Sequence, residues 1–276
     1  MLMKKVYLAF AATLAILVLS LLSCSKDSSL APHNSLDYEK IASEHSAALE
    51  YFFTTTSKNE LEELNQSTKS SDDSNVSLLD EYIRKTINEF SFAQYPDIVL
   101  PNLTKSDNFS ELEINEIIRA SINKVVGDYT VYSSKDKLNA KIANYLSSIK
   151  NIYPKEIIDI VSISLYILLD SYDYWIEQDG FVRWGQEFLS EDELNALVEQ
   201  YNLPDISNTT KSGAEMRAWS EMARADAAAG GFLADCIDSD ANGFIGGLIL
   251  GKFIIQAGLV SAAWSSCSTY LKDLLR

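Results

Sequence analysis

Oxygen-bearing side chains alternate ahead of a glycine near the C-terminal end of the chain. Asp238, Asp240 and Asn242 occupy the first, third and fifth positions of a calcium-binding loop, and Gly243 occupies the position of its sharp turn. The last position, which normally carries a bidentate glutamate, is Ile249. Losing those oxygens removes much of the affinity, so the pattern predicts at most a weak Ca²⁺ site. A polar turn joining two helices is the favoured interpretation.

Cys236 and Cys267 are the only cysteines besides Cys24. An oxidising compartment favours a disulfide between them. If residues 244–274 form one straight helix folded back on the preceding one, however, the two cysteines lie about 30 Å apart. A disulfide needs Cα atoms within about 7 Å, so a bridge requires a break, for which Gly258 is the place. The sequence leaves open whether the two cysteines form a disulfide, and two free thiols are slightly favoured.

Signals for catalysis are weak. The two histidines are His33, in a polar segment, and His45, on an expected helix where we interpret it as a packing or surface residue. Asp170, Asp173 and Glu177 share one helical face and could form an acidic site, but a solvated stripe has the same spacing. No zinc-protease, serine-hydrolase, P-loop or Cys-x-x-Cys motif occurs, so the sequence predicts a protein that is not an enzyme.

Four aromatic residues gather in the same stretch of sequence. They could form a shelf that stacks against a sugar, or they could fill the core. We favour core packing for this set, which comprises Tyr172, Tyr174, Trp175 and Trp184.

Helical signals dominate the elements that must position these residues. Capping boxes, in which a serine and a glutamate three residues later satisfy the first backbone N–H groups of a helix, occur at Ser57, Ser110, Ser190 and Ser212, with a weaker relative at Ser77. Apolar residues recur three and four apart after them. We therefore predict an all-α multi-helix bundle with helices at 36–54, 58–66, 77–92, 110–126, 134–151, 154–178, 190–202, 212–236 and 244–274.

The helix that starts at Pro154 is apolar on every side, which is typical of a central buried helix, and Gly180 is expected to stop it. A glycine-rich helical hairpin is expected over residues 212–276. Gly247 and Gly251 are spaced to let another helix approach closely. The hairpin could be buried in the body or could insert into a membrane. Burial is favoured because the apolar stretch is about 17 residues long, which is short for a membrane span.

The N-terminus carries an export signal. Lys4 and Lys5 precede an uncharged apolar run that ends in Leu21-Leu22-Ser23-Cys24. This segment resembles the lipobox signal peptide of bacterial lipoproteins. The resemblance implies cleavage before Cys24, lipid on its sulfur and anchoring to a membrane, whereas an uncleaved N-terminal anchor helix is the alternative. We accordingly expect a signal peptide at 1–23, a flexible tether at 24–36 and a single body at 37–276.

Two short motifs give a second resemblance. Ser171-Tyr172-Asp173-Tyr174-Trp175 and Asp240-Ala241-Asn242-Gly243 are similar to segments of a group of uncharacterised bacterial lipoproteins with a glycine-rich tail. That resemblance implies no activity.

The net charge of the chain limits the classes of molecule that it can bind. The chain carries 23 basic and 39 acidic residues, a net charge of −16, and removal of Lys4 and Lys5 with the signal peptide makes it −18. Such a surface repels nucleic acid and anionic lipid heads. We expect a lipid-anchored envelope protein, at the outer membrane or cell surface, that binds or assembles with an unknown partner and needs no cofactor. The alternatives are insertion of the hairpin into a membrane and an unrecognised envelope hydrolase.

Overall fold

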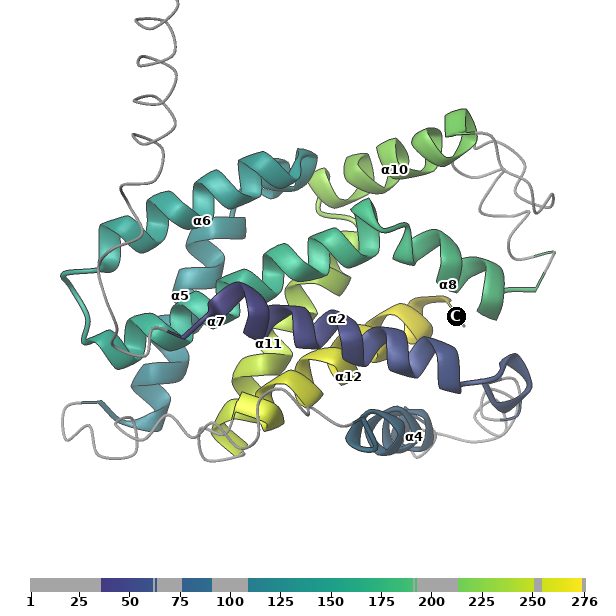
Figure 1. The fold of residues 1–276 in the computed structure, drawn as a ribbon, viewed down its shortest axis with the longest axis horizontal. Helices are drawn as coiled ribbons and strands as arrows, with labels where there is room; N and C mark the ends of the chain where they lie inside the picture. The colour runs from purple at the N-terminus through teal and green to yellow at the C-terminus, as the bar shows by residue number, and fades with distance from the viewer. Residues whose placement is uncertain are drawn as a thin grey trace, which may run out of the picture. The chain divides into compact units, whose positions relative to one another are not determined.

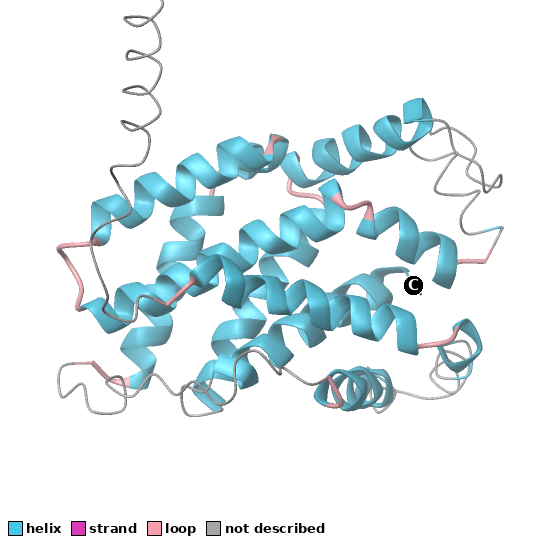
Figure 2. Ribbon diagram, in the orientation of Figure 1, coloured by secondary structure: helices cyan, strands magenta, loops and turns pink. Residues whose placement is uncertain are grey.

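The computed structural model describes residues 36–61, 63, 76–90, 109–190, 192, 213–250 and 255–274, and all of these residues except Leu36 belong to one compact unit, Asp37–Arg276. Every regular element in this part of the chain is helical (Figure 2), which confirms the all-α class. The elements are α2 (Tyr38–Thr55), α4 (Val76–Asn88), α5 (Glu111–Val126), η2 (Tyr129–Ser133), α6 (Lys135–Ile149), α7 (Lys155–Tyr172), η3 (Asp173–Glu177), α8 (Gly180–Phe188), α10 (Gly213–Ala228), α11 (Phe232–Leu250) and α12 (Ile255–Leu274).

Helix α7 is the central helix of the bundle, as predicted. It packs against α2, α5, α6 and α11, while α12 packs against α11, α2 and α4 (Figure 1). Thirteen of its eighteen residues are buried, so it is covered on nearly all sides. The rings beyond its C-terminal end belong to the core as well, since Tyr174 is 1% exposed and Trp175 and Trp184 are not exposed. Core packing of the aromatic set is thereby confirmed, and no exposed sugar shelf is formed.

Capping boxes start helices where the sequence predicts them. At Ser110 the backbone N–H and hydroxyl donate to Glu113 Oε2 at 2.7 and 2.8 Å, while the hydroxyl accepts from the Glu113 N–H. Ser57 and Glu60 form the same arrangement. The boxes at Ser190 and Ser212 include residues outside the described part. Asp80, from the weaker relative, instead accepts hydrogen bonds from Ser268 and Lys272 on α12.

The end of the central helix differs from the prediction. Gly180 does not stop a helix but begins α8, and the chain turns at Asp179, whose φ of 56° lies in the left-handed region. The last turn before it, η3, is a π-helix, closed by the Gln178 N–H donating to the Asp173 carbonyl at 2.8 Å. A Cβ at Gly180 would lie 2.5 Å from the Tyr174 carbonyl oxygen, so this close approach requires glycine.

The turn of the C-terminal hairpin is also placed differently. We expected helices at 212–236 and 244–274 with a polar turn between them, but α11 continues through residues 232–250. The expected helix 212–236 breaks at Gly230 and Gly231, where Gly230 has a φ of 71° and Asp226 Oδ2 accepts a hydrogen bond from the Leu233 N–H at 2.8 Å. The expected helix 244–274 is divided between α11 and α12, which form the two arms of the hairpin. The polar residues at 238–242 do not end the helix because other helices satisfy their side chains, as the next section shows.

The glycines of α11 allow α12 to pack directly against it. A Cβ at Gly247 would lie 2.2 Å from the Ala257 carbonyl oxygen, and one at Gly243 would lie 2.6 Å from the Ser261 carbonyl oxygen. The apolar residues around them, among them Phe244, Ile245, Leu248, Ile255 and Leu259, are at most 1% exposed. The glycine-rich helical hairpin is confirmed, and these apolar residues of its two helices, α11 and α12, are buried in the body.

Among the helices that the structure describes, none has the length and apolar character needed to cross a membrane.

Two neighbouring glycines give a matched test of this packing. We expect Gly247→Ala to lower the free energy of unfolding by about 1–3 kcal/mol, because the new methyl group must push two backbones apart. Gly246→Ala should raise it by up to about 1 kcal/mol, because Gly246 has no atom within 4 Å of the new Cβ and alanine is the better helix former. Urea denaturation of both variants checks this, and equal effects would contradict the close approach at Gly247.

Candidate functional site

A buried histidine joins three helices at the centre of the molecule. His45 lies on α2 among core residues spaced three and four apart, with Ile41 before it and Leu49 after it. Its Nδ1 lies 3.1 Å from Asp170 Oδ2 at the end of α7, and its Nε2 lies 3.1 Å from Asp240 Oδ1 on α11. The His45 and Asp240 side chains are completely buried, and Asp170 is 16% exposed. We call these three residues the charge cluster.

The geometry of the charge cluster favours a protonated ring. A neutral imidazole would turn a lone pair toward one of the two carboxylates, whereas an imidazolium donates toward both. Burial opposes the charge, but Asp240 and Asp170 outweigh it and raise the pKa of His45 to about 10. Burial also raises the pKa of Asp240, and His45 and Ser171 oppose that shift. His45 therefore stays protonated in the neutral range, because its two carboxylate partners outweigh the cost of burying its charge.

Hydroxyl groups complete the surroundings of the charge cluster. Ser171 donates to Asp240 Oδ2, while the Ser46 hydroxyl and N–H donate to Asp170 Oδ2 at 2.6 and 3.2 Å. Asp170 therefore accepts from both a buried ring and a residue near the surface. Buried charges are tolerated when their remaining lone pairs are satisfied in this way.

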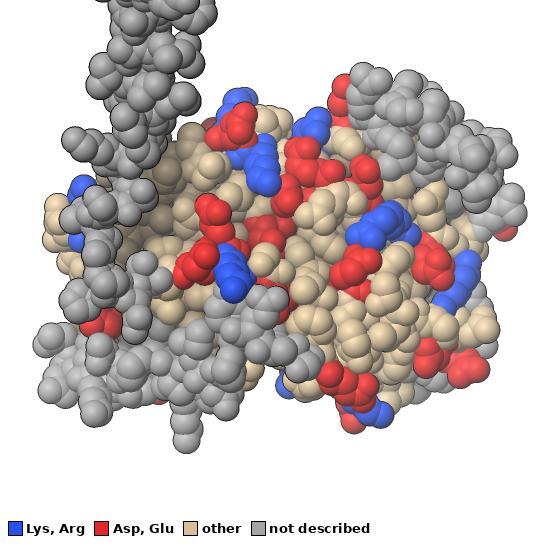
Figure 3. Space-filling model, viewed as in Figure 1, with Lys and Arg blue, Asp and Glu red and all other residues tan. Residues whose placement is uncertain are grey.

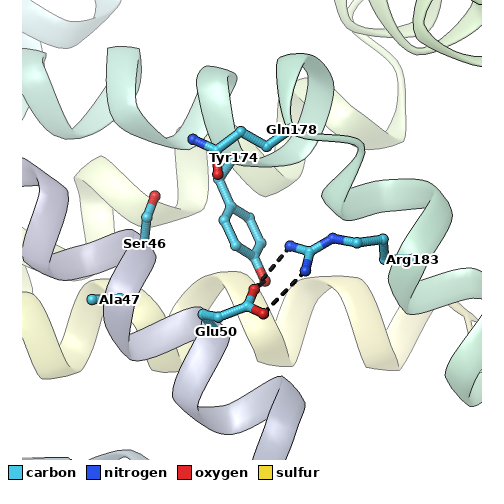
Figure 4. Close-up of a pocket in the computed structure, with 6 residues that line it drawn as sticks. All are labelled: Ser46, Ala47, Glu50, Tyr174, Gln178 and Arg183. Carbon is cyan, nitrogen blue, oxygen red and sulfur yellow. Dashed lines mark hydrogen bonds and ion pairs between the residues drawn. The ribbon is translucent and has the colours of Figure 1, made fainter.

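A pocket of about 510 Å³ lies next to the charge cluster, and one of its lining residues, Ser46, donates a hydrogen bond to Asp170 of the cluster. Figure 4 shows Ser46, Ala47 and Glu50 on α2, facing Tyr174 and Gln178 from the end of the central helix and Arg183 from α8. The six lining residues thus come from α2, from the segment that follows α7 and from α8. Its volume lies within the range of small-molecule sites.

An ion pair crosses the pocket. Arg183 Nη1 and Nη2 donate to the two Glu50 carboxylate oxygens at 3.0 and 2.9 Å. The Tyr174 hydroxyl accepts from the Trp184 indole N–H at 2.9 Å and makes a longer bond, of 3.4 Å, to Glu50. Hydrogen bonding with Glu50 raises the pKa of Arg183, so the guanidinium stays charged. The pocket thus presents one carboxylate and one guanidinium to solvent.

The structure separates the residues of the expected calcium loop. Asp238 accepts a hydrogen bond from the Tyr132 hydroxyl, Asp240 belongs to the charge cluster, and the Asn242 amide donates to the Asp238 carbonyl oxygen within the helix. Burial raises the pKa of Asp238 to about 6. The calcium hypothesis requires a loop at these residues. That part of the prediction is wrong, because the residues lie in the helix α11. No group of three or more potential metal-ligating side chains occurs among the described residues.

Cys236 and Cys267 are buried thiols in the structure, on the two facing helices α11 and α12. The argument that placed them about 30 Å apart rested on a turn near residue 240. That premise is wrong, because both residues lie more than ten positions from the 251–254 connection between the two helices. Burial raises the pKa of Cys267 well above its ordinary value, which makes this thiol a poor nucleophile.

The three acidic residues at the end of the central helix do not form an acidic site. Asp170 contacts His45, Asp173 pairs with Lys135 at 2.6 Å, and Glu177 pairs with Arg224 at 3.0 Å. The expected solvated stripe holds for Asp173 and Glu177, whose ion pairs lie at the surface, but not for Asp170, which contacts the buried ring of His45.

Sequence reasoning missed both His45 and Arg183. A signal for His45 was present, because it falls on the apolar stripe of α2, and Asp240 is likewise a carboxylate within an apolar helix. Their pairing could not be read from the chain, because the two residues are 195 positions apart. Arg183 gave no signal, since it follows a break whose direction the left-handed Asp179 sets.

Comparisons with family models, curated proteins and solved structures find no match for this chain.

The charge cluster predicts a pH dependence. Because folding raises the pKa of His45 from 6.5 to about 10, its contribution to stability is complete below pH 6.5 and is lost as the pH rises through about 10. The chain has two histidines, so NMR titration of the imidazole signals resolves them readily. We expect the ring of His45 to remain protonated above pH 8. Two rings titrating together near pH 6.5 would contradict the assignment.

Removing the ring should destabilise the fold strongly. His45→Gln leaves two carboxylates without their cation, which costs about 3–5 kcal/mol in the free energy of unfolding. His33→Gln, in a histidine outside the described residues, is the matched control. Denaturant titration at pH 7 measures the difference, and a loss below about 1 kcal/mol in H45Q would show that the ring carries no buried charge.

The thiols give a third measurement. Because both side chains are 0% exposed, we expect Cys236 and Cys267 to resist a thiol reagent in the native state and to react after denaturation. Protein purified without reductant tests the disulfide: no reaction in denaturant until a reductant is added would show that the two cysteines are bridged.

Proposed function

We propose that this chain is a lipid-anchored protein of the bacterial cell envelope, at the outer membrane or cell surface, that binds a ligand or partner. The observation that carries the proposal is the apolar segment that ends at Leu21-Leu22-Ser23-Cys24, the pattern of a lipoprotein signal peptide. Lipid on Cys24 would hold the folded body at a membrane without a spanning helix in that body.

The pocket supports binding as the activity of that body. Its lining offers hydroxyl, amide, carboxylate and guanidinium groups within a volume suited to a small molecule. Glu50 and Arg183 neutralise each other, and the Ser46 hydroxyl donates to Asp170. This arrangement suits recognition of a polar ligand better than activation of a nucleophile, which requires a neighbouring base.

The surface supports a partner other than nucleic acid. Figure 3 shows acidic side chains over much of the visible face, with basic side chains set among them. A net charge of −16 repels phosphate backbones and keeps the body soluble beside an anionic membrane.

Cys24→Ser tests the anchor. In cells that express the full chain we expect the wild type to incorporate labelled palmitate and to fractionate with membranes, because the lipidated sulfur is its attachment point. The C24S variant should take up no label. Ser25→Ala, which changes the next residue and leaves the lipobox intact, should behave as the wild type does.

Two outcomes would refute the anchor. Labelling that persists in C24S would place the acyl chain elsewhere, and an unlabelled wild type that retains residues 1–23 would identify an uncleaved N-terminal helix instead. Mass spectrometry of the purified N-terminus distinguishes these cases.

A further inference from the structure

The pair that crosses the pocket exposes both of its charges. Side-chain exposure is 34% for Arg183 and 43% for Glu50. Most of the chain's described ion pairs are made at the surface, but this one lines a pocket of about 510 Å³ (Figure 4). A ligand that enters the pocket therefore meets a positive and a negative group side by side.

Arg183 keeps donors that Glu50 does not use. Its two terminal nitrogens bind Glu50, but its Nε is buried and has no hydrogen-bond partner. The guanidinium carbon lies 5.2 Å from the Phe53 ring centre and 5.6 Å from the Tyr174 ring centre, so aromatic faces hold its position. The two terminal nitrogens carry four N–H groups, of which Glu50 accepts two, and with 34% of the side chain exposed a ligand oxygen can accept from the others.

Glu50 likewise keeps acceptors that Arg183 does not use. A carboxylate offers about four lone-pair sites. Arg183 takes one on each oxygen, and the bond from Tyr174 is long, at 3.4 Å. Since 43% of the side chain is exposed, an ammonium group can reach the remaining sites without displacing Arg183.

We propose that the pocket binds a small zwitterion that carries an ammonium and a carboxylate group, such as a free α-amino acid. The carboxylate lies against Arg183 and the ammonium against Glu50. Ser46 and Gln178 supply further polar contacts, and Ala47 supplies an apolar one. This inference rests on the proposed binding function and names its ligand class.

Ligands with a single charge fit the pocket less well. An anion meets Glu50 as well as Arg183, with Asp170 and Asp173 hydrogen-bonded to the lining residues Ser46 and Gln178. A cation meets Arg183 at short range. A ligand with both charges gains an attractive partner for each of its groups, whereas a ligand with one charge gains one partner and meets a like charge without a second attraction to offset it.

A binding screen with matched probes tests the proposal. The twenty amino acids are titrated calorimetrically into the purified lipoprotein in detergent, beside acetate, which carries only the carboxylate, and methylamine, which carries only the ammonium. We expect at least one amino acid to bind saturably and both single-charge probes to bind at least about tenfold more weakly. Absence of binding by every amino acid, or equal binding by a single-charge probe, overturns the proposal.

Variants of the pair locate the site. Arg183→Gln and Glu50→Gln should each weaken binding of that amino acid at least about tenfold, because each removes one charge-assisted contact. The exchanged pair Glu50→Arg with Arg183→Glu should recover part of the affinity, since it again offers both charges. Unchanged binding in both single variants overturns the assignment.

Arg224→Gln is the matched control. Arg224 forms a similar pair with Glu177, at 3.0 Å and with side-chain exposures of 33% and 31%, but it lines no part of the pocket. We expect its binding to equal that of the wild type. Thermal unfolding without ligand identifies a variant that has lost its fold, and E50Q, which keeps the shape of the side chain, tests the site if R183Q fails to fold.

The failure of this proposal can be told apart from failure of the binding function. Neutral sugars in the same screen provide the distinction: a sugar that binds the wild type but not E50Q would refute the zwitterion and retain the pocket as a binding site. The C24S experiment on the anchor is independent of either result.

Discussion

The contact of His45 with two carboxylates holds three helices in one arrangement. Asp170 ends the central helix and Asp240 lies in the C-terminal hairpin, so the ring on α2 fixes the positions of both. Such a buried pair adds little net stability by itself, because desolvation offsets the attraction. It does penalise every packing in which one charge loses its partner. Apolar surface drives the bundle together, and the charge cluster selects the arrangement in which the helices meet.

The pocket depends on the same contact. Asp170 accepts from His45 inside the core and from the hydroxyl and N–H of Ser46 at the pocket. One carboxylate thus fixes both the buried ring and the part of α2, at Ser46, that lines the pocket. Glu50 follows Ser46 by one helical turn, so its position across from Arg183 is set by the rotation of α2 that His45 defines.

The sequence predicts the features that depend on residues close together in the chain. The boxes at Ser57 and Ser110 involve residues three positions apart, and the structure has them as expected. The hairpin turn was misplaced because Asp238 and Asp240 have the composition of a turn and their partners are distant in sequence. The charge cluster and the pocket could not be predicted for the same reason. A charged residue is typical of a loop when it is solvated, but it can also lie in the core when a partner distant in sequence neutralises it, and the sequence does not distinguish the two cases.

The π-turn at Asp173–Glu177 redistributes the charges that follow the central helix. In a regular α-helix, residues 170, 173 and 177 would project in one row and repel one another. Widening the last turn by one residue separates their directions, and Asp170, Asp173 and Glu177 reach α2, α6 and α10 respectively. The wider turn thus places three carboxylates, which would otherwise repel one another, beside cationic side chains on three separate helices.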